Sequence, residues 1–129
     1  MRILLDTQCW LWMLSAPERL SPKARTIVSG SRHDLVLSAV SAWEIAIKHA
    51  LGKIDLPADP VEYVTSRMAQ SAVLPLAITH EHALQVARLP PHHRDPFDRL
   101  LVAQAQIEDI PILTTDRQLA AYGVSTIDA

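Results

Sequence analysis

Short, continuously apolar runs alternate with longer amphipathic segments along the chain. The apolar runs predict strands at residues 2–5, 34–38, 73–78, 110–116 and 124–127. The amphipathic segments predict helices at residues 8–14, 22–30, 39–52, 60–72, 80–89, 96–109 and 117–123. Strands that are apolar throughout and alternate with helices favour a mostly parallel sheet covered on both faces. We therefore expect an α/β three-layer sandwich.

Polar residues mark where several of these helices begin. Ser21 before Pro22 predicts an N-cap with proline in the first turn, and Thr79 is predicted to be the N-cap of the helix that follows it.

The chain of 129 residues shows no repeat and no linker, so we expect one domain over residues 1–129.

Composition narrows the class of protein. Hydrophobic residues make up 49% and charged residues 20%, which is ordinary globular usage. No apolar run is long enough to cross a bilayer, and the first residues do not resemble a secretory signal, so we expect a cytosolic protein without a membrane partner. Cys9 is the only cysteine, which excludes an internal disulfide and a thiolate metal site. The net charge of −2 lacks the basic excess usual for nucleic-acid binding.

Two predicted strands end in an acid, Asp6 and Asp116. In open parallel sheets the ligand site lies beyond the carboxyl ends of the strands, so both carboxylates are candidates for chemistry. Either residue could equally form an Asx turn or cap the following helix, and the sequence leaves these alternatives open.

Glu44 lies inside a predicted apolar stripe. On a helix it falls between Val40, Ile47 and Leu51, where a carboxylate is costly unless it is paired, hydrogen-bonded or bound to metal. A salt bridge to Lys48 at i+4 is the alternative, and it explains an exposed glutamate better than a buried one. The stripe favours a functional role.

The segment "HHRDPFDRLLVAQAQ" contains two further acids. Asp95 precedes Pro96, which is typical of an N-cap. Asp98 shares a helix face with Leu101, Val102 and Ala105, so we expect it to point inward. Asp95 is therefore interpreted as a cap and Asp98 as a candidate for chemistry.

A parallel sheet could bring Asp6, Glu44, Asp98 and Asp116 to one edge. Four carboxylates in one pocket raise one another's pKa values. A hard divalent cation relieves that repulsion, and all-oxygen ligation suits Mg²⁺ or Mn²⁺. Such an ion activates water and stabilises charge on a phosphoryl oxygen, so the residues alone suggest a metal-dependent hydrolase.

The stretches "LLDT", "SAVSAWEIAIKHALGKI", "HHRDPFDRLLVAQA" and "ILTTD" resemble, in order and over nearly the whole chain, the PIN domain of VapC-type toxins, the ribonuclease halves of type II toxin–antitoxin pairs. The resemblance implies a Mg²⁺- or Mn²⁺-dependent endoribonuclease whose acids correspond to Asp6, Glu44, Asp98 and Asp116. Asp6, Glu44 and Asp98 would hold one metal, and Asp116 would place a second ion or a water. Asp95 would be a cap or an outer residue, and Thr7, Thr114 and Thr115 would hold water or substrate.

Partners follow from the same resemblance. It implies an RNA substrate, a cognate antitoxin and a homodimer, with Trp10, Trp12 and Trp43 as candidate contact surfaces. Basic residues flank two of the acids and are candidates for contacting RNA phosphates: His92, His93, Arg94, Arg99 and Arg117. The alternatives are a non-catalytic binding module of the same fold and a metal-dependent phosphodiesterase acting on DNA. The histidines of "HEH" (80–82) and "HH" (92–93) lack zinc-site spacing, so we expect them to be solvated.

Overall fold

The computed structural model describes residues 1–129 and contains a five-stranded sheet in the order β3-β2-β1-β4-β5. Every pair of neighbouring strands is parallel. The strands are β1 (Arg2–Leu5), β2 (Asp34–Ser38), β3 (Leu74–Leu76), β4 (Ile112–Thr114) and β5 (Thr126–Asp128), and all five predicted strands are present.

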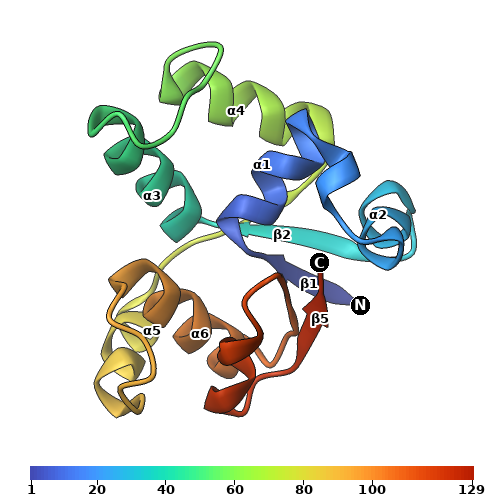
Figure 1. Ribbon diagram of the computed structural model, residues 1–129. Coiled ribbons are helices and arrows are strands. Elements are labelled where there is room, and N and C mark those ends of the chain that lie inside the picture. Colours follow the sequence, from blue (N-terminus) through green and yellow to red (C-terminus); the bar gives the residue numbers. More distant parts are fainter.

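Helices cover both faces of the sheet. One layer holds α1 (Thr7–Ser15), α2 (Pro22–Ser29), α3 (Ala39–Ala50) and α4 (Pro60–Ser71), and the other holds α5 (His80–Gln85) and α6 (Pro96–Glu108) (Figure 1). Short 3₁₀ helices follow at η1 (Pro17–Arg19), η2 (Val86–Arg88) and η3 (Arg117–Tyr122). The three-layer α/β prediction is confirmed. None of the helices combines the length and apolar content needed to cross a membrane.

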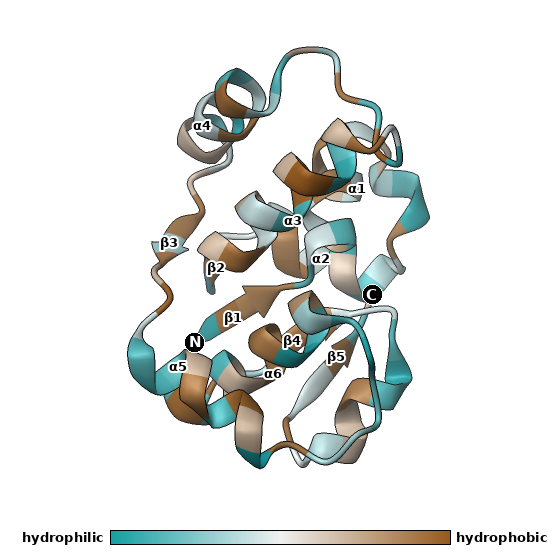
Figure 2. Ribbon diagram, turned by 90° about the vertical axis from the view of Figure 1, so that its left-hand side faces the viewer, coloured by the Kyte–Doolittle hydropathy of each residue, from teal (hydrophilic) through white to brown (hydrophobic).

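The central strands supply side chains to two separate cores. Ile3 and Leu5 of β1 lie in the core beneath α1–α4, whereas Leu4 lies in the core beneath α6. Successive strand residues point to opposite faces, and a strand buried on both faces must therefore be apolar at every position. The continuous apolar runs arise from this arrangement, and Figure 2 shows them as apolar strands between the two helical layers.

The predicted helix at residues 80–89 is shorter in the structure. It is α-helical only to Gln85 and continues as 3₁₀ turns to Arg88. Leu89 is extended, with ψ of 139°. The residue before a proline is disfavoured in the α conformation, and Pro90 follows Leu89, so the helix cannot run on.

The predicted buried face of α3 is correct at Val40 and wrong at Leu51. Ser41 and Ile45 are buried together with Val40, whereas Leu51 is 64% exposed. The Thr7 hydroxyl on α1 donates a 2.7 Å hydrogen bond to Ser41 Oγ, which turns the Ser41 side of α3 toward α1. The periodicity of apolar residues cannot predict a hydrogen bond between the side chains of two helices. Glu44 consequently lies at the border of the buried face.

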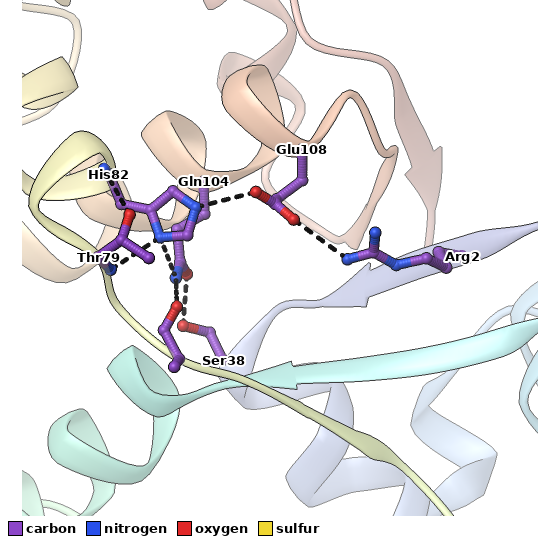
Figure 3. Close-up of polar contacts among 7 residues, drawn as sticks. Arg2, Ser38, Thr79, His82, Gln104 and Glu108 are labelled. Carbon is purple, nitrogen blue, oxygen red and sulfur yellow. Dashed lines mark hydrogen bonds and ion pairs between the residues drawn. The ribbon is translucent and has the colours of Figure 1, made fainter.

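A buried polar network joins α5 and α6 to the sheet (Figure 3). His82 is 2% exposed, so the expectation of a solvated histidine was wrong for this residue. Its Nδ1 accepts from the Thr79 N–H at 3.1 Å, and its Nε2–H donates to Glu108 Oε2 at 3.1 Å. Gln104, fully buried on α6, donates to the Ala77 carbonyl at 3.3 Å and accepts from the Ser38 hydroxyl. The network fixes α6 relative to the N-cap of α3.

Candidate metal-binding active site

A pocket of about 570 Å³ lies at the carboxyl ends of β1 and β4, beside α3 and the start of α6. It brings together residues that are far apart in the sequence. Seven charged side chains line it: Asp6, Glu44, Lys48, Lys53, Asp95, Asp98 and Asp116. All four acids singled out from the sequence therefore reach one cavity, as the parallel topology predicts.

Asp6 follows β1 and is held by the neighbouring strand. The Thr114 hydroxyl donates a 2.7 Å hydrogen bond to Asp6 Oδ2 and accepts a 3.0 Å bond from the Asp116 N–H. Asp6 is the N-cap residue of α1 by position, but its side chain makes no capping hydrogen bond. Burial raises the pKa of Asp6, an effect that the Thr114 hydrogen bond only partly offsets and that the charge of Glu44 reinforces. The Asp6 carboxylate is thus directed into the pocket rather than used as a cap.

Glu44 is oriented by its own helix. Its side chain is 12% exposed and accepts a hydrogen bond from the Lys48 ammonium one turn later on α3. The salt bridge considered from the sequence is therefore present, and it involves a largely buried carboxylate rather than a solvated one. Burial explains why this glutamate needs a cation beside it.

The two acids of "DPFD" differ in role. Asp95 Oδ1 accepts a 2.8 Å hydrogen bond from the Phe97 N–H and caps α6. The Asp98 carboxylate, one position into the helix beyond Phe97, makes no bond back to the cap and lies in the pocket. Burial raises the pKa of Asp98 to about 7, and the charges of Asp95, Asp6 and Glu44 add to the effect. Asp95 therefore acts as the N-cap of α6, whereas the Asp98 carboxylate is available to the site.

The Asp116 side chain is fixed by two hydrogen bonds. Its Oδ1 accepts from the Gln118 N–H at 2.9 Å, and its Oδ2 accepts from the His93 Nε2–H at 2.8 Å. The other ring nitrogen of His93, Nδ1, is hydrogen-bonded to the Tyr122 hydroxyl at 2.9 Å. Because His93 is also largely buried, the expectation of a solvated histidine was wrong here as well. Tyr122, His93 and Asp116 form a chain that ends in the pocket.

The donor set fits a hard divalent cation. Three potential ligand atoms, one from each of His93, Asp98 and Asp116, lie within 4.8 Å of one another. Asp6 and Glu44 face them closely enough to raise the pKa of Asp98. Like charges gathered in a partly buried pocket are stabilised by a cation, and carboxylate oxygens are the preferred ligands of Mg²⁺ and Mn²⁺.

The basic residues expected to contact RNA fall into two groups. His92, Arg94 and Arg117 are exposed. The Arg99 guanidinium donates to the Val86 carbonyl of η2 at 3.1 Å and to the Pro90 carbonyl of the loop before α6 at 2.9 Å. His93 is bonded to Asp116. Arg99 and His93 therefore make internal contacts that hold the loop and the last acid in place.

Sequence reasoning missed two residues of this region, Lys53 and Tyr122. Gly52 has a φ of 72°, and the backbone bonds Gly52 N–H to His49 O and Lys53 N–H to Lys48 O end α3 in a Schellman turn that brings Lys53 to the pocket. The "LGK" at the end of a predicted helix was a readable signal for this turn. No local signal marks Tyr122, which meets His93 only through the tertiary fold.

Comparisons with known proteins agree with this geometry. The PIN domain family model matches residues 3–124. Two relatives from Mycobacterium tuberculosis are similar: ribonuclease VapC22 is 31% identical over 93% of this chain and 91% of its own length, and ribonuclease VapC16 is 43% identical over 46% of this chain and 43% of its own length. The alignment thus spans less than half of VapC16.

A solved structure shares the fold. It is VapBC2 from Rickettsia felis, described as bound to a DNA fragment from their promoter, with a TM-score of 0.73, 11% identity, and coverage of 100% of this chain and 99% of that chain. Together with the family match, the ordered acids and their common pocket identify the chain as a PIN-domain protein of the VapC type.

Proposed function

We propose that this protein is a metal-dependent endoribonuclease and the toxin of a type II toxin–antitoxin pair. The observation that carries the proposal is the meeting of Asp6, Glu44, Asp98 and Asp116 in one pocket at the carboxyl ends of parallel strands. The similarity to two proteins named as VapC ribonucleases supports RNA as the substrate.

In this proposal Asp6, Glu44 and Asp98 hold a Mg²⁺ or Mn²⁺ ion, and Asp116 places a second ion or a water. When bound, the cation would supply Lewis-acid stabilisation of a phosphoryl oxygen and would activate water for hydrolysis of the phosphodiester bond. Thr114 orients Asp6 and the Asp116 backbone, and Thr7 fixes α1 against α3. Thr115 is exposed and precedes Asp116 in the sequence, and its proposed role is to hold water or substrate.

RNA binding requires positive charge near the acids, because the chain carries a net charge of −2. The exposed residues His92, Arg94 and Arg117 flank Asp95 and Asp116 in the sequence and are the proposed phosphate contacts. Arg99 and His93 were also candidates for phosphate contacts. Because both side chains make internal hydrogen bonds, we propose that they position the loop before α6 and Asp116 instead.

The proposal extends to partners. VapC-type membership supports a cognate antitoxin, and a cellular RNA target supports action in the cytoplasm. A homodimer would place two pockets near one RNA. Trp43, which is 50% exposed and packs edge-on against Phe97 at 5.0 Å between ring centroids, is available to a partner surface. Trp10 is not, because it is fully buried.

Cleavage of mixed cellular RNA by the purified protein tests the proposal. The reactions contain Mg²⁺, Mn²⁺ or chelator, and they compare the wild type with Asp6→Asn, Asp98→Asn and the control Asp109→Asn. Asp109 lies outside the pocket with a φ of 52°, a left-handed conformation that asparagine adopts readily, so the control makes the same chemical change without strain. We expect metal-dependent cutting that only the two pocket variants lose.

Three results would contradict the proposal. Cutting that persists in chelator would exclude metal dependence. Cutting of single-stranded DNA at an equal or higher rate than RNA would favour a general phosphodiesterase. No cutting by antitoxin-free, folded wild type on any nucleic acid would favour a non-catalytic binding module.

A further inference from the structure

The pocket contains its own counter-ion. The Lys48 ammonium donates a hydrogen bond to Glu44 Oε2 across one turn of α3. Both side chains line the pocket that also receives Asp6, Asp95, Asp98 and Asp116. The pair therefore lies among the proposed metal ligands rather than on an outer surface of the helix.

Lys48 is held in this position from more than one side. Its Nζ lies 5.9 Å from the centroid of the Phe97 ring on α6. Burial disfavours the charged form of Lys48, but the hydrogen bond and charge of Glu44, together with the charges of Asp95 and Asp98, more than offset it and raise the pKa. The Lys48 side chain is thus placed by contacts with both α3 and α6.

The charges of the pocket do not balance. Five carboxylates, Asp6, Glu44, Asp95, Asp98 and Asp116, line it with two lysines, Lys48 and Lys53. Lys53 makes no ion pair with any of the acids, whereas Lys48 pairs with Glu44. The single positive charge of Lys48 cannot balance five carboxylates, whereas a divalent oxygen-seeking cation carries two charges and can be ligated by several of them.

We propose that Lys48 is a built-in counter-ion that neutralises Glu44 in the metal-free protein and is released from Glu44 when a divalent cation binds. The inference rests on the proposed function, since it assigns Glu44 to the metal. The Lys48 side chain is 31% exposed, so water can solvate its ammonium once it leaves Glu44, and the divalent cation replaces it as the partner of the largely buried Glu44 carboxylate. The lysine stem is flexible and lets the ammonium move within the pocket without a change in α3. Lys48 is a positioning residue that sets the metal affinity of the site.

Mn²⁺ titration calorimetry at pH 8 on the full chain, free of antitoxin, tests this proposal. The variants are Lys48→Met, which keeps the stem and removes the charge, Lys48→Arg, which keeps a cation, and Lys53→Met, which removes a charge from the same pocket without breaking an ion pair. We expect Lys48→Met to bind Mn²⁺ about two- to fivefold more tightly than the wild type, the range for losing one partly exposed competing ion pair. Lys53→Met should show a smaller gain, and Lys48→Arg none.

A second measurement needs no substitution. In the wild type, the side-chain ammonium signal of Lys48 in an NMR titration should move on addition of diamagnetic Mg²⁺, with a larger displacement than that of Lys53. This measurement decides the question if Lys48→Met does not fold.

The outcomes separate the two proposals. A wild type that binds no Mn²⁺ overturns the metal site and this inference with it. A wild type that binds Mn²⁺, with Lys48→Met equal to or weaker than both the wild type and Lys53→Met, leaves the metal site standing and overturns the exchange. An unmoved Lys48 signal at saturating Mg²⁺ has the same meaning.

Discussion

The Thr114 hydroxyl donates a 2.7 Å hydrogen bond to Asp6 Oδ2 and so connects the carboxyl ends of the adjacent parallel strands β1 and β4. The same hydroxyl accepts from the Asp116 N–H at 3.0 Å. One side chain therefore sets the position of two acids that lie 110 residues apart in the sequence. The sequence alone does not reveal this role of Thr114, because the contact with Asp6 depends on β1 and β4 being neighbours in the sheet.

Replacing Thr114 with valine should disturb both acids. Valine keeps the shape but leaves the Asp116 N–H unpaired and frees the Asp6 carboxylate, so we expect a loss of about 1–3 kcal/mol in the free energy of unfolding. The pKa of Asp6 should also rise, because the Thr114 hydrogen bond lowers it. Mn²⁺ binding should therefore weaken, and its pH midpoint should move upward. The control Thr115→Val, at an exposed neighbour, should change both quantities less. Equal effects of the two variants would contradict the role assigned to Thr114.

Asp98 should make the metal-free protein less stable as the pH rises. Its pKa is raised from 3.8 in the unfolded reference to about 7, so the folded state binds more protons between these values. A raised pKa gives stability that is complete below the lower value and is lost as the pH rises through about 7. In chelator, urea unfolding should show a fall in stability from pH 5 to pH 8 that Asp98→Asn reduces, and saturating Mg²⁺ should reverse the fall. A pH dependence identical in wild type and Asp98→Asn would refute this assignment.

The local signals of the sequence predicted most elements correctly. Residues 34–38 form β2 with the expected bounds, and Ser21 caps α2 through a 3.1 Å bond from the Ala24 N–H. These features depend on neighbours in the chain. An N-cap needs a polar side chain that accepts from an N–H two or three residues later in the chain. A strand buried on both faces needs an unbroken apolar run. Such requirements are visible in the sequence.

Features that depend on distant residues were not predictable in the same way. The orientation of α3 depends on Thr7, and the burial of His82 depends on Glu108 and Gln104. The four acids could be grouped because parallel topology places strand ends at one edge, which is a rule about the fold as a whole. The chain from Tyr122 through His93 to Asp116 follows no such rule.

His93 should act on the site through Asp116. His93→Ala removes the donor to Asp116 Oδ2, so we expect slower single-turnover cleavage of RNA, while Tyr122→Phe, which removes only the outer hydroxyl, should have a smaller effect. A double-mutant cycle with Asp116→Asn measures the coupling. If His93 works through Asp116, the double variant should cleave no more slowly than Asp116→Asn alone. Full additivity would instead indicate an independent role for His93, such as direct contact with the metal or the RNA.

Gln104 should be important for stability although it lies outside the pocket. Its side chain accepts from the Ser38 hydroxyl, donates to the Ala77 carbonyl at 3.3 Å, and is fully buried beside His82 (Figure 3). Gln104→Leu leaves these buried groups without a partner, and an unpaired buried polar group costs about 1–3 kcal/mol. We expect a loss of that size in the free energy of unfolding measured in urea with chelator present.

The matched control for Gln104 is Gln106→Leu, the same change on the same helix. Gln106 is only partly buried and donates to the Tyr122 carbonyl at 3.1 Å, where water can replace it. Its loss of stability should be smaller. Because Ser38 is the N-cap of α3 and accepts from the Val40 N–H, Gln104→Leu should also weaken Mn²⁺ binding by displacing the helix that carries Glu44. A Gln104→Leu protein with reduced stability and unchanged Mn²⁺ affinity would show that the network supports the fold alone. Unchanged stability would show that the Ser38 and Ala77 groups find other partners.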